Sequence, residues 1–271
     1  MIVLPSVQAG ITGYSGVDLD FKNYISKIET ADAASLETET KDAIKAFILG
    51  CKSDGIWSSI ISCAIFAGAR TLNGALSTLK GSALTNNLFV TANYNRQSGL
   101  LGGTGKYLDT NLTNTIDAAN KNTVHAATYT TTASSGGYTL GSDTTQNGSI
   151  ALRPYSGATS SFRAHNAGSI DNSGASTFPV PIVGFAGVSR STSTDVNLYY
   201  KTSTGYFSGT NTISSLTITV PTNIYVFDRF NTGINYNNRI AFYSVGTYLD
   251  LVKLEARVKT LINTYVSLGL A

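Results

Sequence analysis

The stretch Arg239-Ile-Ala-Phe-Tyr-Ser-Val-Gly246 decides the fold that this sequence predicts. Successive side chains of an extended segment point to opposite faces, so Ile240 and Phe242 share one face while Ala241 and Tyr243 share the other. Apolar residues on both faces are typical of a strand that is covered on both sides. We therefore predict a sheet strand here that lies between two other layers of the molecule.

A helix is predicted to follow this strand. Gly246 ends the strand, and Thr247 with Asp250 three residues later has the pattern of an N-cap and a first-turn carboxylate. We expect Thr247 to be the N-cap and the helix to pack on the outside of the sheet. The apolar residues that recur at helical spacing are Leu251, Leu254, Val258, Leu261, Ile262 and Tyr265.

The region before the strand has the pattern of an antiparallel β-domain. Short segments rich in Tyr, Phe, Val, Ile and Thr alternate with clusters of Gly, Ser and Asn. No long helical pattern interrupts them, which favours a sandwich or barrel over a parallel sheet. The predicted strands are residues 88–94, 107–110, 123–131, 138–141, 150–155, 161–165, 182–189, 196–201, 216–220, 224–230 and 239–245.

The N-terminal third differs in character. Apolar periodicity predicts two amphipathic helices, the second with Ser35 as its N-cap, and then a buried apolar segment that includes Trp57. The first residues have no period, and we interpret them either as a loose terminus or as an arm that docks on a neighbouring subunit through Pro5 and Tyr14. The predicted parts are an extended arm (1–16), a helical region (17–82), a β-sandwich (83–246) and a C-terminal helix (247–271).

Composition excludes several classes of function. The 271 residues are 42% hydrophobic and only 13% charged, so the chain can bury a core under a neutral polar surface. A net charge of +3 without a run of Lys or Arg argues against a nucleic-acid partner. No apolar stretch is long enough to span a membrane, and residues 1–5 are too short for a signal peptide. We expect synthesis in a cytoplasm and no membrane partner.

The order of several short motifs resembles a known family. The motifs are Gly50-Cys-Lys-Ser-Asp-Gly-Ile-Trp57, Ala67-Gly-Ala-Arg-Thr-Leu-Asn-Gly-Ala-Leu76, Tyr94-Asn-Arg-Gln-Ser-Gly-Leu100, Gly103-Thr-Gly-Lys-Tyr-Leu-Asp-Thr110, Gly187-Val-Ser-Arg190, Asn223-Ile-Tyr-Val-Phe227 and the stretch 239–246. The series covers residues 18–271 and is similar to structural proteins of tailed bacteriophages and prophages that carry a concanavalin A-like (laminin-G-like) jelly roll. In that family, helices ending in Gly-Ile-Trp precede a sandwich that a strand and a helix complete.

The resemblance implies both a fold and a function. The implied fold is mainly β, an antiparallel concanavalin A-like jelly-roll sandwich with N-terminal helices and a C-terminal helix. The implied function is a non-enzymatic virion structural protein of a tail, fibre or capsid, made in the host cytoplasm and assembled with other virion proteins. We expect a homo-oligomer, with a trimer favoured, formed through the N-terminal region. The alternatives are a carbohydrate-binding module that recognises host-surface glycans, and a glycan depolymerase.

The sequence offers little catalytic chemistry. A glycoside hydrolase needs two carboxylates beside the scissile bond, but no glutamate lies between Glu39 and Glu255, and the aspartates between them are isolated. Residues 143–147 and 171–172 combine carboxylate and amide oxygens that would suit Ca²⁺, yet we interpret both as ordinary turns. We predict no catalytic residue, no cofactor and no metal site.

Other chemistry-bearing residues also have structural interpretations. We expect His125 and His165 to be structural strand residues, and Cys51 and Cys63 to be buried free thiols. Four arginines are predicted to pair with aspartates across strands rather than to face a partner: Arg153, Arg163, Arg190 and Arg229. Tyrosines in segments rich in Ser, Gly and Asn remain candidates for stacking on sugar rings: Tyr138, Tyr155, Tyr200, Tyr206 and Tyr236.

Overall fold

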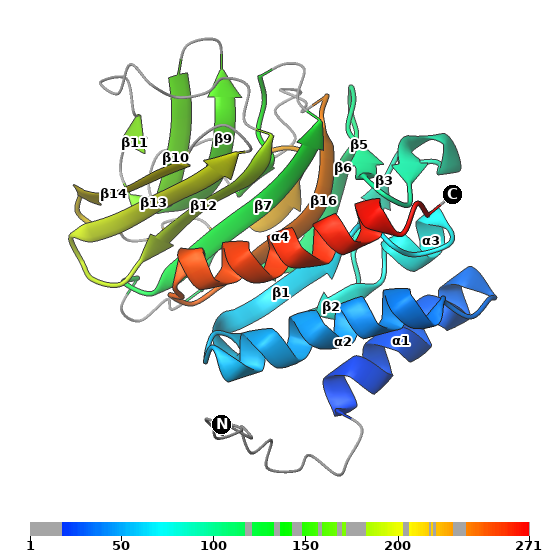
Figure 1. The fold of residues 1–271 in the computed structure, drawn as a ribbon. Helices are drawn as coiled ribbons and strands as arrows, with labels where there is room; N and C mark the ends of the chain where they lie inside the picture. The colour runs from blue at the N-terminus through cyan, green and yellow to red at the C-terminus, as the bar shows by residue number, and fades with distance from the viewer. Residues whose placement is uncertain are drawn as a thin grey trace, which may run out of the picture.

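Two antiparallel sheets form a sandwich in this computed structural model, which confirms the predicted mainly-β class (Figure 1). The residues that the structure describes are 18–116, 121–132, 136–142, 148–156, 159–166, 170–171, 183–202, 206–216, 218, 221–229 and 237–270. The predicted arm, with Pro5 and Tyr14, lies outside them. None of the described helices is long and apolar enough to cross a membrane.

The larger sheet, sheet A, has nine strands. Its strands are β1 (Ile60–Ile65), β2 (Thr78–Lys80), β4 (Tyr94–Asn95), β5 (Gly99–Leu101), β7 (Val124–Thr132), β12 (Gly184–Arg190), β13 (Asp195–Thr202), β14 (Tyr206–Thr212) and β16 (Arg239–Gly246). They run in the order β14-β13-β12-β7-β16-β1-β2, and β5 pairs with both β16 and β4. The strand predicted to decide the fold therefore lies between β7 and β1 inside the sheet.

Sheet B covers one face of sheet A. Its strands are β3 (Thr85–Asn87), β6 (Tyr107–Thr113), β8 (Leu140–Gly141), β9 (Ser149–Ser156), β10 (Thr159–Asn166), β11 (Ile170–Asp171) and β15 (Asn223–Val226), in the order β11-β10-β9-β8-β15-β6-β3. The other face of sheet A carries α1 (Leu19–Asp32), α2 (Thr38–Ser53) and α4 (Leu251–Ser267), as Figure 1 shows. The short elements are α3 (Leu72–Ala75), η1 (Trp57–Ser59) and η2 (Thr91–Asn93).

Strand β16 is buried on both faces, as its sequence predicts. Phe242 points to the helices, where its ring centroid lies 5.7 Å from that of Phe47 on α2. Tyr243 points into the sandwich and stacks on Phe66 at the same centroid distance. The strict alternation fails at one place, because the register with β7 shifts between Ile240 and Phe242. Ile240 consequently joins Tyr243 in the core between the sheets instead of sharing the face of Phe242.

The sandwich begins earlier in the chain than residue 83. Strands β1 and β2 come from the region predicted to be helical, and β1 pairs with β16 from Ile60 to Ile65. Segment 88–94, predicted as a strand, instead forms a turn and η2. The side-chain oxygen of Asn86 accepts from the backbone N–H of Phe89, and its amide donates to the Phe89 carbonyl, so this side chain closes the turn.

Both predicted N-caps shift by three residues or fewer. Helix α2 begins at Thr38 with Glu37 as its N-cap, and the carbonyl of Ser35 instead accepts from the Arg70 side chain. Helix α4 begins at Leu251 with Asp250 as its N-cap, and that carboxylate accepts from the backbone N–H groups of the first turn. Thr247 is held elsewhere, since its N–H donates to the carbonyl of Ser59.

Two structural predictions from the sequence have different outcomes. Cys51 and Cys63 are buried and free, as predicted, and burial raises the pKa of the Cys63 thiol to about 12. Arg190 forms no ion pair with an aspartate of the described residues. Its buried guanidinium donates to four backbone carbonyls, those of Ala164, Thr192, Ser193 and Ile213. The fork of guanidinium donors can satisfy several carbonyls at once, which a single carboxylate partner would not do.

His125 on β7 fixes the entry to α4. Its Nδ1 donates to the carbonyl of Thr247 at 2.6 Å, and its Nε2 accepts from the hydroxyl of Ser244 at 2.8 Å. A carbonyl can only accept, so the first contact assigns the ring proton to Nδ1. The ring is fully buried, and this burial lowers the pKa of His125 to about 4 although the carbonyl contact acts to raise it. The imidazole is therefore neutral and structural.

The depressed pKa of His125 predicts a specific loss of stability in acid. In the unfolded chain the imidazole binds a proton below a pH of about 6.5, but in the fold it stays neutral down to about 4. The unfolded state binds more protons in this window, so the free energy of unfolding falls as the pH decreases through it. We expect His125 to account for roughly 2 to 3 kcal/mol of that fall by pH 4.5.

Urea unfolding at several pH values measures this contribution. The curve of unfolding free energy against pH should be flatter for His125→Gln than for the unsubstituted chain. His165→Gln is the matched control, because it removes another buried histidine and leaves His125 in place. Parallel curves for the unsubstituted chain and His125→Gln would contradict the assignment.

Candidate functional site

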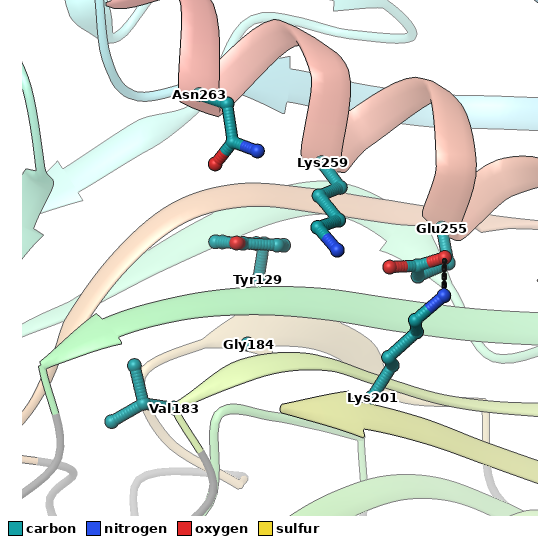
Figure 2. A pocket seen from close by; sticks show the side chains of 7 residues that line it. All are labelled: Tyr129, Val183, Gly184, Lys201, Glu255, Lys259 and Asn263. Atoms are coloured by element: carbon teal, nitrogen blue, oxygen red, sulfur yellow. Dashed lines mark ion pairs between the residues drawn. The ribbon is translucent and has the colours of Figure 1, made fainter. Parts of the chain in front are cut away.

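A polar pocket lies between α4 and sheet A, and we call it the α4 pocket (Figure 2). Its volume is about 330 Å³, which is at the small end of ligand sites in proteins. The helix forms one wall, and β7, β12 and β13 form the other. The residues that line it are Tyr129, Val183, Gly184, Lys201, Glu255, Lys259 and Asn263.

The helix places three polar side chains over the pocket. Glu255, Lys259 and Asn263 are four residues apart, a spacing that puts them on one side of a helix. Figure 2 shows Lys259 between the other two, with its side chain and that of Asn263 directed at the strands. The sheet contributes Lys201 from β13, whose ammonium lies 3.6 Å from a carboxylate oxygen of Glu255.

Charge in the α4 pocket is unevenly neutralised. The side chain of Glu255 is only 3% exposed, and its one ion pair among the described residues is with Lys201, which is 39% exposed. Lys259 has no ion pair within the described part of the chain. With two ammonium groups and one carboxylate, the pocket carries one net positive charge.

Tyr129 supplies the aromatic surface of the pocket. It lies on β7 beneath the helix, and its ring is seen nearly edge-on in Figure 2, so one ring face is turned towards α4. Burial raises the pKa of Tyr129, and the negative charge of Glu255 raises it further. The phenol therefore stays protonated at neutral pH, where it can donate a hydrogen bond.

The sequence pointed to other tyrosines. The structure buries Tyr138 and Tyr200 at 7% and 2% exposure, so neither ring offers a face to a sugar. Tyr138 lies against two arginines, with the guanidinium carbons of Arg153 and Arg229 at 5.4 and 5.2 Å from its ring centroid. The side chains of Tyr155, Tyr206 and Tyr236 lie outside the described residues.

A different signal could have found the α4 pocket. Glu255 is the only glutamate after Glu39, and it interrupts the apolar face that runs through Leu254 and Val258. A lone carboxylate on a buried helix face needs a partner, and the pocket supplies Lys201. Apolar spacing alone predicts the helix but not this charge.

The remaining chemical groups do not form a reaction centre within the described residues. The contact between His125 and Ser244 has the geometry of a nucleophile and base, but both side chains are fully buried and the third partner is a carbonyl. No group of three or more His, Cys, Asp or Glu side chains suited to a metal occurs in the described part of the chain. The side chains of the two predicted Asx turns, 143–147 and 171–172, lie outside it.

Comparison with known proteins gives low similarity throughout. No protein-family model and no curated protein matches this chain. The receptor-binding domain of botulinum neurotoxin mosaic serotype C/D aligns with a TM-score of 0.45 and 11% identity, over 74% of this chain and 50% of that chain. A Trypanosoma rangeli sialidase in complex with the inhibitor DANA aligns with a TM-score of 0.42 and 8% identity, over 82% of this chain and 38% of the sialidase.

An arabinofuranosidase complexed with arabinofuranosyl-alpha-1,2-xylobiose aligns with a TM-score of 0.40 and 9% identity, over 61% of this chain and 40% of the enzyme. The chain thus spans half or less of the length of these three structures. All three TM-scores are below 0.5, so the alignments assign neither a family nor an activity to this chain.

Proposed function

We propose that this chain is a non-enzymatic structural protein of a tailed-phage virion, which assembles through its N-terminal region and displays a β-sandwich. The series of motifs that resembles phage structural proteins motivates the proposal. The arrangement of the described elements supports it. The helices α1, α2 and α4 lie on one face of sheet A, and sheet B lies on the opposite face (Figure 1).

The observation that carries the proposal is how Asp18 is held at the start of α1. Asp18 caps α1 by accepting from the backbone N–H groups of Asp20 and Phe21, and it pairs with Lys52 of α2 at 2.7 Å. Lys52 also lies 2.6 Å from Asp20, and Asp20 accepts from the Trp57 indole N–H at 2.9 Å. A docking segment that precedes Asp18 would thus extend from a fixed point on the helical layer.

The state of Asp18 agrees with a fixed attachment point. Burial by itself would raise the pKa of this carboxyl, but the Lys52 ammonium and the N–H donors of the first turn of α1 outweigh it. The pKa of Asp18 therefore lies below its usual range, and the carboxylate stays charged at neutral pH. Trp57, predicted to be a core residue, is instead half-buried beside these charges, with the Lys80 ammonium 4.8 Å from its ring centroid.

Removal of residues 1–16 should dissociate the oligomer into monomers. We expect the full chain to have the mass of a homo-oligomer, with three times the chain mass of 28.5 kDa favoured, and the truncated chain to be monomeric. Light scattering coupled to size-exclusion chromatography measures both masses. The truncated chain keeps Asp18 and the whole helical layer, so its circular dichroism should be unchanged.

Substitutions give the matched comparison for the truncation. Replacing Pro5 and Tyr14 by serine should weaken the oligomer, whereas replacing Tyr248, a tyrosine 40% exposed elsewhere on the surface, should leave it intact. A monomeric full chain, or an oligomer that survives truncation, would remove the assembly role from the N-terminal region.

The second candidate function is the recognition of host-surface glycans, and the α4 pocket favours it. Its lining combines a tyrosine ring with ammonium, carboxylate and amide groups, which can pair with the hydroxyls of a sugar. A glycan array probed with the full chain should show binding to a restricted set of sugars. An array without signal at high protein concentration would exclude this function and leave the assembly role untouched.

A further inference from the structure

We infer that the α4 pocket binds a sugar that carries a carboxylate, such as a hexuronic acid residue. The inference rests on the glycan-binding function proposed above and specifies its ligand class. Three features carry it: the Glu255 carboxylate, which has no hydrogen-bond donor among the described residues, the exposed Lys259 ammonium, which has no ion pair among them, and the size of the pocket.

Glu255 can accept hydrogen bonds from hydroxyl groups of a ligand. Its side chain is 97% removed from solvent, yet no hydrogen bond to it occurs within the described residues, and the Lys201 contact at 3.6 Å is longer than such a bond. Its oxygens are not among the fully buried atoms without a partner, so they face the pocket, where water or a ligand can donate to them. Figure 2 shows Glu255 beside the pocket, so a polyol could supply the missing O–H donors.

Lys259 offers a positive charge to a ligand from the exposed edge of the pocket. The ion pair between Glu255 and Lys201 leaves Lys259 as the uncompensated charge in the pocket among the described residues. Lys259 lies between Glu255 and Asn263 in Figure 2, so a ligand carboxylate could contact its ammonium and the Asn263 amide together. The hydroxyls of the same ligand would then lie towards Glu255.

The dimensions of the pocket favour one sugar ring. A volume of about 330 Å³ is small for a ligand site, and three of its lining residues, Val183, Lys259 and Asn263, are exposed. The ring face of Tyr129 offers a flat apolar surface of the kind against which the C–H groups of a pyranose pack. A terminal acidic residue of a longer glycan would therefore fit better than an internal segment.

Titration of the full, isotope-labelled chain with methyl glucuronide tests the inference, and methyl glucoside is the neutral match. NMR should show the glucuronide shifting the amide signals of Tyr129 and Lys259, with an affinity at least about tenfold above that of the glucoside. The preference should shrink as salt is added, because it depends on charge. Lys259→Gln should lower the affinity for the glucuronide to that for the glucoside.

A matched variant distinguishes the effect of the Lys259 charge in the pocket from the effect of the net charge of the chain. Lys45→Gln removes the same charge from the exposed side of α2 and should leave both affinities unchanged. Equal binding of the two sugars, or equal effects of the two variants, would overturn the acidic-sugar inference and retain glycan binding. If the sugar shifts amide signals only of residues outside the α4 pocket, and the glycan array shows binding, the glycan-binding function stands but the α4 pocket is not its site. If no amide signal shifts in the titration and the glycan array shows no binding, both the inference and the glycan-binding function are wrong.

Discussion

The structure depends on the burial of both faces of β16. This strand has no polar face to present to water, since all of its residues after Arg239 are buried. Leaving either face open would expose large apolar side chains such as Phe242 or Tyr243, at a cost of about 1.5 to 3 kcal/mol for each. Sheet B covers one face and the helical layer covers the other, so the third layer is required by the sequence of a single strand.

The positions of α2 and α4 follow from the need to cover the Phe242 face of β16. Phe47 of α2 packs on Phe242, and α4 is held beside α2 by the bidentate pair between Arg257 and Asp54, with atoms 2.7 and 2.8 Å apart. His125 holds the start of the same helix through Thr247. Because α4 is fixed at both places, the pocket beneath it has a defined shape, and its polar lining is a consequence of how the sheet is covered.

The sequence predicts the strands better than the site, for physical reasons. Composition predicts β7, β9, β10 and β13 within one or two residues, because segments rich in β-branched and aromatic residues lie between clusters of Gly, Ser and Asn. Strand β1 is apolar except for Ser62 and shows no alternation, so its pattern does not distinguish a strand from part of the helical region. Arg190 was misassigned because backbone carbonyls, which no residue type reveals, are its partners. Tyr129 lies under a helix more than a hundred residues away, which local composition cannot show.

The two sides of α4 explain how assembly and ligand binding could coexist in one chain. Arg257 lies two residues from both Glu255 and Lys259, so on a helix it faces away from them and towards α2. The Asp18 anchor belongs to α1 and α2, whereas the α4 pocket opens over β12 and β13. A subunit contact made on the α1 and α2 side of the helical layer would therefore leave the pocket accessible. Each copy in an oligomer would then present one pocket, and weak single sites would gain avidity from their number.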